Sequence, residues 1–167
     1  MKFIFKIHEN KIGDNILFLD RDGVVIEDTG YPIEIKKLKI KEFSINNLVH
    51  FKEKNNLSVC GFVTNQSGVS RGYFSEEKFW ETHDYIIGCC NSLGLVINFT
   101  CVNFFTKDDY FRKPNNGMLE TAINYFGAKK DKSFMVGDKD TDMQAAKKSN
   151  LNFKNITYFN NKTYLDI

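Results

Sequence analysis

The sequence lacks a strong excess of either charge. Its 167 residues contain 23 lysines and arginines against 21 aspartates and glutamates, a formal net charge of +2. This balance excludes a protein that binds nucleic acid or an anionic membrane through a broad basic surface. No apolar stretch approaches the roughly 20 residues of a membrane-spanning helix, and Lys6 interrupts the N-terminal apolar run too early for a signal peptide. We therefore expect a cytoplasmic protein with neither nucleic-acid nor membrane partners.

Cysteine and proline are also scarce. The four cysteines lie at positions 60, 89, 90 and 101 and form no C-x-x-C pair, which argues against a disulfide framework or a zinc site and indicates reduced thiols. Only two prolines accompany 16 phenylalanines, a composition that argues against disorder. A chain of this length can bury about 70% of its unfolded surface. We expect residues 1–167 to form one domain and to act as a monomer.

Short apolar runs alternate with helix-like segments along the chain. Runs that are apolar on both faces are typical of strands buried in a parallel sheet, and we expect five, at 16–19, 57–63, 99–105, 134–136 and 156–159. Apolar residues at helical spacing lie between them, with Ser75 as an expected helix start and Gly127 as an expected stop. The alternation predicts an α/β, doubly wound sheet, and the stretch before residue 16 predicts an added edge strand.

Two carboxylates, Asp20 and Asp22, follow the first buried run, at the sheet edge where ligands bind in such folds. Like charges this close repel one another, and burial adds to the cost. Mg²⁺ would resolve the conflict, because it takes oxygen ligands and needs only one or two protein carboxylates. Asp20 could also attack phosphorus and form an aspartyl-phosphate, with Asp22 as acid and base. Taken alone, the pair is equally well explained as two solvated loop residues.

Two further polar segments follow later strands. Thr64 opens a turn that ends at Gly68, and such a turn offers a hydroxyl and successive backbone N–H groups to an anion. Arg112 and Lys113 precede Pro114, which favours an extended, stiff segment. A fixed ammonium is a good partner for phosphate oxygens. Taken alone, each segment is more simply explained as an ordinary surface loop.

Three acidic residues gather where the fourth buried run ends and a helix begins: Asp138, Asp140 and Asp142. Asp138 stands at the end of the strand and is the best metal candidate. Asp142, four residues later, faces the same side if the helix begins there. Aspartates are common at helix N-termini without any function, so the cluster alone establishes nothing. Its meaning comes from its position at the same predicted sheet edge as the other three segments.

In combination the four segments resemble the haloacid dehalogenase superfamily of phosphatases, from about residue 16 to residue 150. The resemblance is carried by D-x-D-G, a strand that ends in Thr, a Lys, and G-D-x-x-x-D, in this order. Finer motifs are similar to a small capless branch that contains the D,D-heptose 1,7-bisphosphate 7-phosphatases and the histidinol-phosphate phosphatases. These motifs are Asp20-Arg21-Asp22-Gly23, Asp28-Thr29-Gly30-Tyr31, residues 64–72, Arg112-Lys113-Pro114 and residues 136–143.

The resemblance implies a Rossmann-like core without a large cap and Mg²⁺-dependent hydrolysis of a small phosphorylated metabolite. It implies that Asp20 is the nucleophile and a metal ligand, and that Asp138 is a metal ligand. Asp22 would be the acid and base and would offer its backbone carbonyl to the metal. Thr64 and Lys113 would hold the transferring phosphoryl group. The residues that would contact the substrate are Asp28, Tyr31, Asn65, Arg112 and Lys139.

One part of the family pattern is missing. Close relatives carry a C-x-H … C-x-C zinc loop before Arg-Lys-Pro, whereas the interval here, residues 106–111, is short and contains neither Cys nor His. We therefore expect no zinc. Because that loop borders the substrate in those relatives, its absence bears on substrate choice. We expect D-glycero-D-manno-heptose 1,7-bisphosphate, with histidinol phosphate or another small phosphorylated metabolite as the alternative.

Two other classes of protein share parts of this pattern. A phospho-receiver domain carries its phosphorylated aspartate at the end of the third strand, where this chain has Phe104-Phe105-Thr106. A non-catalytic phosphosugar-binding protein would have lost a chemical group, whereas all of the expected groups are present. The sequence therefore favours an enzyme, a phosphatase.

Overall fold

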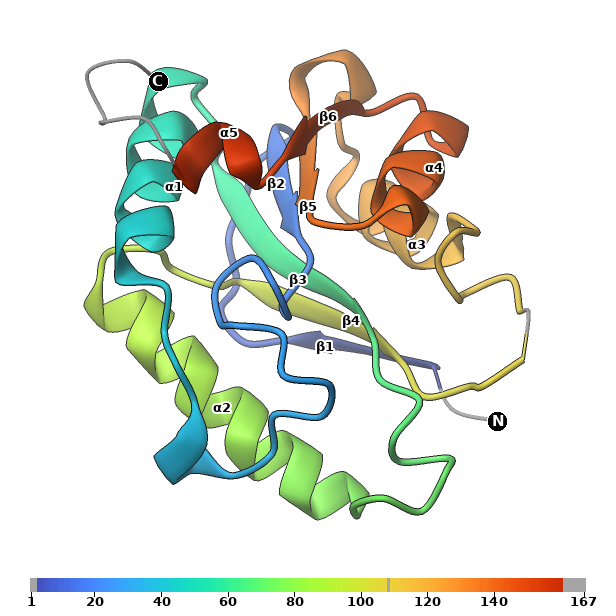
Figure 1. Ribbon diagram of the computed structural model, residues 1–167. Helices are drawn as coiled ribbons and strands as arrows, with labels where there is room; N and C mark the ends of the chain where they lie inside the picture. The colour runs from blue at the N-terminus through green and yellow to red at the C-terminus, as the bar shows by residue number, and fades with distance from the viewer. Residues whose placement is uncertain (1–2, 108, 161–167) are drawn as a thin grey trace.

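The computed structural model describes residues 3–107 and 109–160, and this part of the chain forms a six-stranded sheet in the order β1-β4-β3-β2-β5-β6 (Figure 1). The strands are β1 (Phe3–Ile7), β2 (Ile16–Leu19), β3 (Val59–Asn65), β4 (Phe99–Asn103), β5 (Phe134–Gly137) and β6 (Asn152–Asn155). All neighbouring pairs are parallel except β1 and β4, which are antiparallel. The mainly parallel sheet and the added edge strand are confirmed.

Strand β2 lies at the centre and is fully buried. Successive side chains of a strand point to opposite faces of the sheet. Leu17 and Leu19 accordingly join one apolar cluster, and Ile16 and Phe18 join the other. This two-sided burial explains the uninterrupted apolar run, because neither face of the strand meets water.

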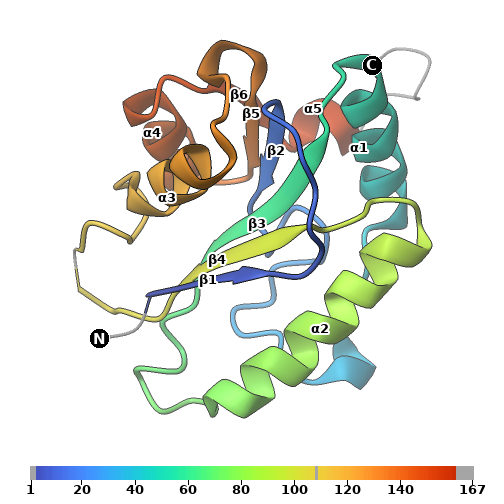
Figure 2. The same ribbon diagram turned by 180° about the vertical axis from the view of Figure 1, so that it is seen from behind.

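Two long helices cover each face of the sheet. α1 (Glu42–Lys54) and α2 (Glu76–Ser92) lie on one face, and α3 (Gly117–Phe126) and α4 (Asp140–Lys148) lie on the other (Figures 1 and 2). The Ser75 side chain accepts a hydrogen bond from the Lys78 backbone N–H and caps α2, as predicted. Gly127 ends α3 in the left-handed conformation, also as predicted. The doubly wound α/β class is therefore confirmed.

The structure corrects one predicted element. The strand expected at 156–159 is wrong, because most of that segment belongs to the short helix α5 (Thr157–Asn160) and the sixth strand is β6. β6 is an edge strand whose terminal residues Asn152 and Asn155 are exposed, so it has no continuous apolar run. Ile156 and Phe159 lie three residues apart and are both buried, with Phe159 at a ring-centroid distance of 5.2 Å from Phe51 of α1.

Residues 20–41 connect β2 to α1 and contain only turns, isolated bridges and the 3-10 helix η1 (Ile35–Lys37); a second such helix, η2 (Lys130–Lys132), precedes β5. The connection places a loop, rather than a helical cap, beside the carboxyl ends of the parallel strands. All four cysteines are free thiols, as predicted. None of the described helices is long and apolar enough to span a lipid bilayer.

Candidate active site

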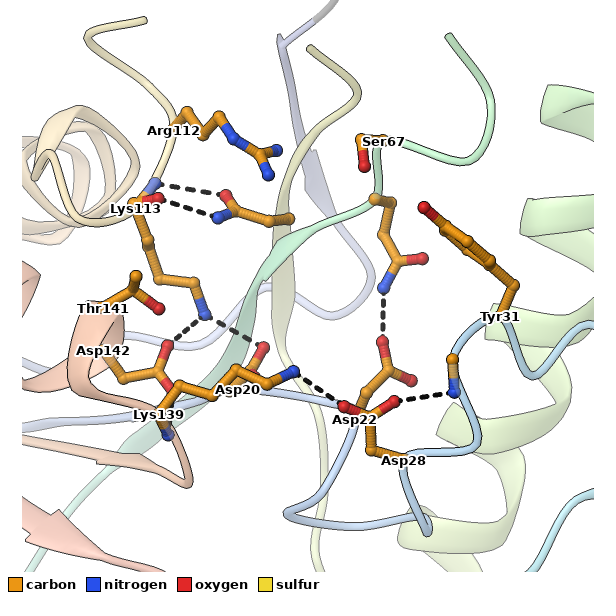
Figure 3. Close-up of a pocket in the computed structure, with 13 residues that line it drawn as sticks. Asp20, Asp22, Asp28, Tyr31, Ser67, Arg112, Lys113, Lys139, Thr141 and Asp142 are labelled. Atoms are coloured by element: carbon orange, nitrogen blue, oxygen red, sulfur yellow. Dashed lines mark hydrogen bonds and ion pairs between the residues drawn. The ribbon is translucent and has the colours of Figure 1, made fainter. Parts of the chain in front are cut away.

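The carboxyl ends of three neighbouring parallel strands bring the predicted residues together. Asp20 follows β2, Asp138 follows β5, and Thr64 and Asn65 end β3. Because β2 pairs with both β3 and β5, these ends meet at one edge of the sheet. Lys113 reaches the same place from the loop before α3 (Figure 3). The polar residues that end these strands therefore lie at one edge of the sheet.

Three carboxylates form the floor of this site. One oxygen from each of Asp20, Asp138 and Asp142 lies within 4.8 Å of the others. Asp20 and Asp142 are buried, and Asp138 is half-buried. Burial raises the pKa of Asp20 to about 7, against the opposing effect of the neighbouring Lys113 ammonium. Burial also raises the pKa of Asp138. Both shifts reflect negative charge held away from water.

The Lys113 ammonium lies between two of these carboxylates. Its Nζ is 3.0 Å from Asp20 Oδ1 and 2.6 Å from Asp142 Oδ1, and the side chain is 3% exposed (Figure 3). Burial alone would lower the pKa of Lys113, but the charges of Asp142 and Asp20 raise it. Asp142 also accepts a hydrogen bond from the Lys139 backbone N–H and so caps α4. One carboxylate therefore fixes both the helix start and the buried cation.

Asn65 holds the backbone of Lys113. Its side-chain Nδ2 donates to the Lys113 carbonyl at 3.0 Å, and its Oδ1 accepts from the Lys113 N–H at 3.1 Å. This reciprocal pair joins the end of β3 to the loop before α3. Asn65 was predicted to contact substrate; it lines the pocket, and its amide is already engaged with the protein.

The side chain of Asp22 points to a different set of partners from Asp20. Arg21, which is 1% exposed, donates from Nε to Asp22 Oδ1 at 3.1 Å and places a second nitrogen 2.9 Å from the same oxygen. Gln66 donates from Nε2 to Asp22 Oδ2 at 2.6 Å and to the Thr64 hydroxyl at 3.0 Å. Asp22 is thus fixed beside the carboxylate cluster, while its side chain is not part of that cluster.

A pocket of about 300 Å³ opens above these groups. At its mouth the Lys139 ammonium is 2.7 Å from Asp28 Oδ2, which ties the loop after β2 to the start of α4 (Figure 3). Arg112 donates from one nitrogen to the Phe105 carbonyl, and Tyr31 forms part of the opposite wall (Figure 3). The predicted residues that line the pocket are Asp20, Asp22, Asp28, Tyr31, Asn65, Arg112, Lys113 and Lys139.

Thr64 and Asp138 were also predicted for the site but are not among the lining residues. Thr64 is buried, and its hydroxyl accepts a hydrogen bond from Gln66, which lines the pocket. Asp138 lies against the turn at Gly23, where an added Cβ would be 2.2 Å from Asp138 Oδ2. Gly23 has a φ of +83°, so it is required both for this close approach and for the backbone conformation.

The carboxylate cluster fits a hard divalent cation. Asp138 Oδ1 is buried and has no hydrogen-bond partner among residues 3–107 and 109–160. Oxygen atoms are the ligands that Mg²⁺ prefers, and a cation would relieve the repulsion that burial amplifies. The residues able to hold it by side-chain oxygens are Asp20, Asp138 and Asp142. The expectation that the protein binds no zinc stays a prediction.

Several pocket residues were not predicted as site residues. Asp142 was expected on the correct side of its helix, but the Lys113 contact depends on a loop 29 positions earlier in the chain. Gln66 and Ser67 belong to the Thr64 motif, and Thr141 lies between two aspartates. No feature of the sequence distinguishes these polar residues from ordinary loop residues, because their roles arise from side-chain direction.

Known proteins share this sequence pattern. The family model described as HAD-hydrolase-like matches residues 110–154. A D-glycero-alpha-D-manno-heptose-1,7-bisphosphate 7-phosphatase from Burkholderia mallei is 36% identical over 138 residues, which are 77% of this chain and 72% of the relative. The histidine biosynthesis bifunctional protein HisB of Campylobacter jejuni is 32% identical over 152 residues, which are 88% of this chain and 42% of that protein.

Solved structures share the fold. A HAD-like protein from Mesorhizobium loti has a TM-score of 0.81 at 27% identity and covers 89% of this chain and 76% of its own. The D,D-heptose 1,7-bisphosphate phosphatase of B. bronchiseptica, solved with magnesium and phosphate, has a TM-score of 0.73 at 25% identity. The match covers 83% of this chain and 78% of that protein. The chain therefore belongs to the family of HAD-like phosphatases that includes the heptose-bisphosphate 7-phosphatases.

Proposed function

We propose that this phosphatase removes the 7-phosphate of D-glycero-D-manno-heptose 1,7-bisphosphate through an aspartyl-phosphate on Asp20. The observation that carries the proposal is the buried Asp20 carboxylate, held 3.0 Å from the Lys113 ammonium beside two further carboxylates at the floor of a polar pocket. A fixed cation next to a buried nucleophile suits a reaction in which charge gathers on a phosphoryl group. The heptose-phosphatase relatives support the same substrate.

Mg²⁺ would be held by the carboxylates of Asp20 and Asp138 and the backbone carbonyl of Asp22, with Asp142 beside them. When bound, it would offset the negative charge of the phosphoryl group and of its carboxylate ligands. The orphaned oxygen of Asp138 and the raised pKa of Asp20 support this assignment.

The protein's own groups divide the reaction into two steps. Asp20 attacks phosphorus through the oxygen that is not paired with Lys113; a bond from phosphorus to Asp20 forms, and the bond to the sugar oxygen breaks. Asp22 gives its proton to that departing oxygen. In the second step Asp22 takes a proton from water, the water oxygen bonds to phosphorus, and the bond to Asp20 breaks. Lys113 and the turn that begins at Thr64 stabilise the equatorial oxygens in both steps.

The charges at the pocket mouth favour a bisphosphate over histidinol phosphate. Arg112 and Lys139 lie there in addition to the Lys113 on the floor. Lys139 is paired with Asp28, whereas Arg112 has no carboxylate partner in the described part of the chain. A substrate with a second phosphate would supply that partner, while histidinol phosphate carries a cationic amine at its other end. Asp28, Tyr31 and Asn65 complete the proposed substrate contacts.

Histidinol phosphate is the second candidate substrate, because HisB of C. jejuni is 32% identical across 88% of this chain. Phosphate release from heptose 1,7-bisphosphate, histidinol phosphate and simple sugar phosphates, with Mg²⁺ and with EDTA, separates the two. We expect the highest kcat/KM for the heptose bisphosphate and none in EDTA. Faster hydrolysis of histidinol phosphate would transfer the assignment to that substrate.

Asp20→Asn tests the mechanism itself. An amide is not a nucleophile toward phosphorus, so turnover should vanish while circular dichroism shows that the variant still folds. Unreduced phosphate release by this folded variant would refute the assignment of Asp20.

A monomeric, cytoplasmic enzyme remains our prediction, and size-exclusion chromatography with light scattering tests the oligomeric part.

A further inference from the structure

Lys41 fastens the turn that follows Asp20. It stands at the N-terminus of α1, where its carbonyl accepts the Ile45 N–H. Its own backbone N–H donates to the Val25 carbonyl at 2.9 Å, and its Nζ donates to the Gly23 carbonyl at 2.6 Å. One residue therefore ties two successive parts of the 20–26 turn to a helix that is anchored in the core through Ile45.

The tied turn is the surface against which Asp138 rests. Any Cβ at Gly23 would be 2.2 Å from Asp138 Oδ2, so the carboxylate is in close contact with the Gly23 backbone. The Gly23 N–H donates to the Ile26 carbonyl, which keeps this peptide inside the turn. A displacement of the Gly23 peptide would change the position of Asp138 relative to Asp20.

The distribution of cations around the carboxylates is uneven. Lys113 contacts Asp20 and Asp142, and within the described part of the chain its ammonium forms no ion pair with Asp138. The Lys41 ammonium instead bonds the carbonyl of Gly23, the residue against which Asp138 lies. Burial lowers the pKa of Lys41, and the Asp138 charge opposes that effect. Lys41 thus has two opposite effects on a bound cation: its charge repels the cation, and its hydrogen bonds keep the ligands in place.

We propose that Lys41 is a positioning residue for the cation site, in which its hydrogen bond to Gly23 holds the Asp20 turn against Asp138. The inference rests on the proposed Mg²⁺ site and extends it to a residue outside the pocket. Groups that orient metal ligands from behind typically change metal affinity by about 10- to 100-fold when removed. Lys41 acts on the backbone next to the ligands, so we expect its loss to weaken metal affinity by about tenfold, the lower end of that range.

The direction in which cation affinity changes distinguishes a positioning role of Lys41 from a purely electrostatic one. If Lys41 acted only through its charge, Lys41→Met would tighten cation binding, because a repelling ammonium would be gone. If it positions the turn, the same substitution weakens binding. Lys39→Met is a matched control, because Lys39 lies two residues away and its side chain forms an exposed ion pair with Glu27 at 3.0 Å. Lys41→Arg retains both the charge and N–H donors.

The experiment is a titration of the metal-free proteins with Mn²⁺, followed by the electron paramagnetic resonance of the free ion, with no substrate present. We expect the dissociation constant to rise about tenfold in Lys41→Met, to change less than twofold in Lys39→Met, and to be largely restored in Lys41→Arg. Equal or tighter binding by folded Lys41→Met would overturn the proposal. Absence of Mn²⁺ binding by the wild type would instead refute the metal site on which it rests.

Discussion

Lys113 is the residue on which the electrostatics of the site depend most directly. It is a buried ammonium in contact with two buried carboxylates, so each charge is compensated only while the others remain. Loss of one member of such a group leaves an uncompensated buried charge, which is more costly than the loss of the whole group. The same ammonium is the proposed donor to the phosphoryl oxygens.

We therefore expect Lys113→Met to lower kcat by about 10²–10³, the usual effect of removing one preorganised donor to developing charge. The melting temperature should fall as well, because Asp20 and Asp142 then face each other without a cation. Steady-state phosphate release and thermal unfolding measure the two effects. Lys147→Met, on the exposed side of α4, is the control and should change neither. Unchanged kcat would mean that Lys113 has a structural role only.

The residues that could be predicted are those whose place depends on the backbone alone. Asp20 and Asp138 follow buried strands. The carboxyl ends of parallel strands lie at the same edge of the sheet, independently of side-chain conformation. Asp142 and Gln66 could not be assigned in the same way. Their contacts with Lys113 and Asp22 are set by side-chain direction across segments distant in the chain.

At the scale of elements, a shared hydroxyl joins three parts of the fold. His8 follows β1, His83 lies on α2, and the Nε2 of each is 2.8 Å from the Thr100 hydroxyl of β4. If one neutral imidazole donates to the hydroxyl oxygen and the other accepts its O–H, one threonine bonds both Nε2 atoms. The buried Nδ1 of His83 has no hydrogen-bond partner among the described residues. The buried His83 ring also stacks on Phe79 at a centroid distance of 5.1 Å. The edge strand β1 is therefore linked to the core by polar contacts as well as by its sheet pairing.

This arrangement makes stability sensitive to acid. Burial lowers the pKa of His83 well below its ordinary value of 6.5, and nearby Arg21 lowers it further. The unfolded chain takes up a proton near pH 6.5 while the folded chain does not, so stability is full above that pH and falls as pH decreases below it. The loss approaches about 1.4 kcal/mol per pH unit from this one group.

We expect His83→Gln to flatten the pH dependence of the free energy of unfolding between pH 6.5 and 5, although it lowers stability at pH 7.5 by removing a well-packed ring. Urea unfolding at several pH values measures both quantities. His50→Gln, on the surface of α1, is the control and should leave the slope nearly unchanged. An unaltered slope in His83→Gln would show that His83 titrates normally in the folded protein.

The elements that sequence analysis placed correctly are those with a clear apolar pattern. The central strands are apolar on both faces, and α2 and α3 carry capping residues that mark their limits. The C-terminal segment has neither signal. β6 is a polar edge strand, and the apolar residues after it bury a short helix against α1 rather than a strand in the sheet. Tertiary contact, not local pattern, decides the structure there.

For the whole molecule, the carboxylate cluster lowers the stability of the metal-free folded state. The raised pKa of Asp138 means that its ionised form is less favourable in the folded chain than in the unfolded one. Above the ordinary titration range of aspartate, this difference lowers stability. The proposed cation would reverse the balance, because a ligand that binds only the folded state adds stability, about 2.7 kcal/mol at a concentration 100 times its dissociation constant.

We expect Mg²⁺ at that saturation to raise the melting temperature of the wild type by about 5–10 °C, given the usual 2–4 °C per kcal/mol for chains of about 150–250 residues. Asp138→Asn should melt at least as high as the metal-free wild type, because it removes a half-buried carboxylate, and should lose most of the response to Mg²⁺. Calorimetry with Mg²⁺ and with EDTA at pH 7.5 measures both. A variant that is less stable without metal but retains the full Mg²⁺ response would show that Asp138 supports the fold and not the cation. The expected pattern, at least as stable without metal but unresponsive to Mg²⁺, would identify the carboxylate cluster as a cation site kept at a cost in stability.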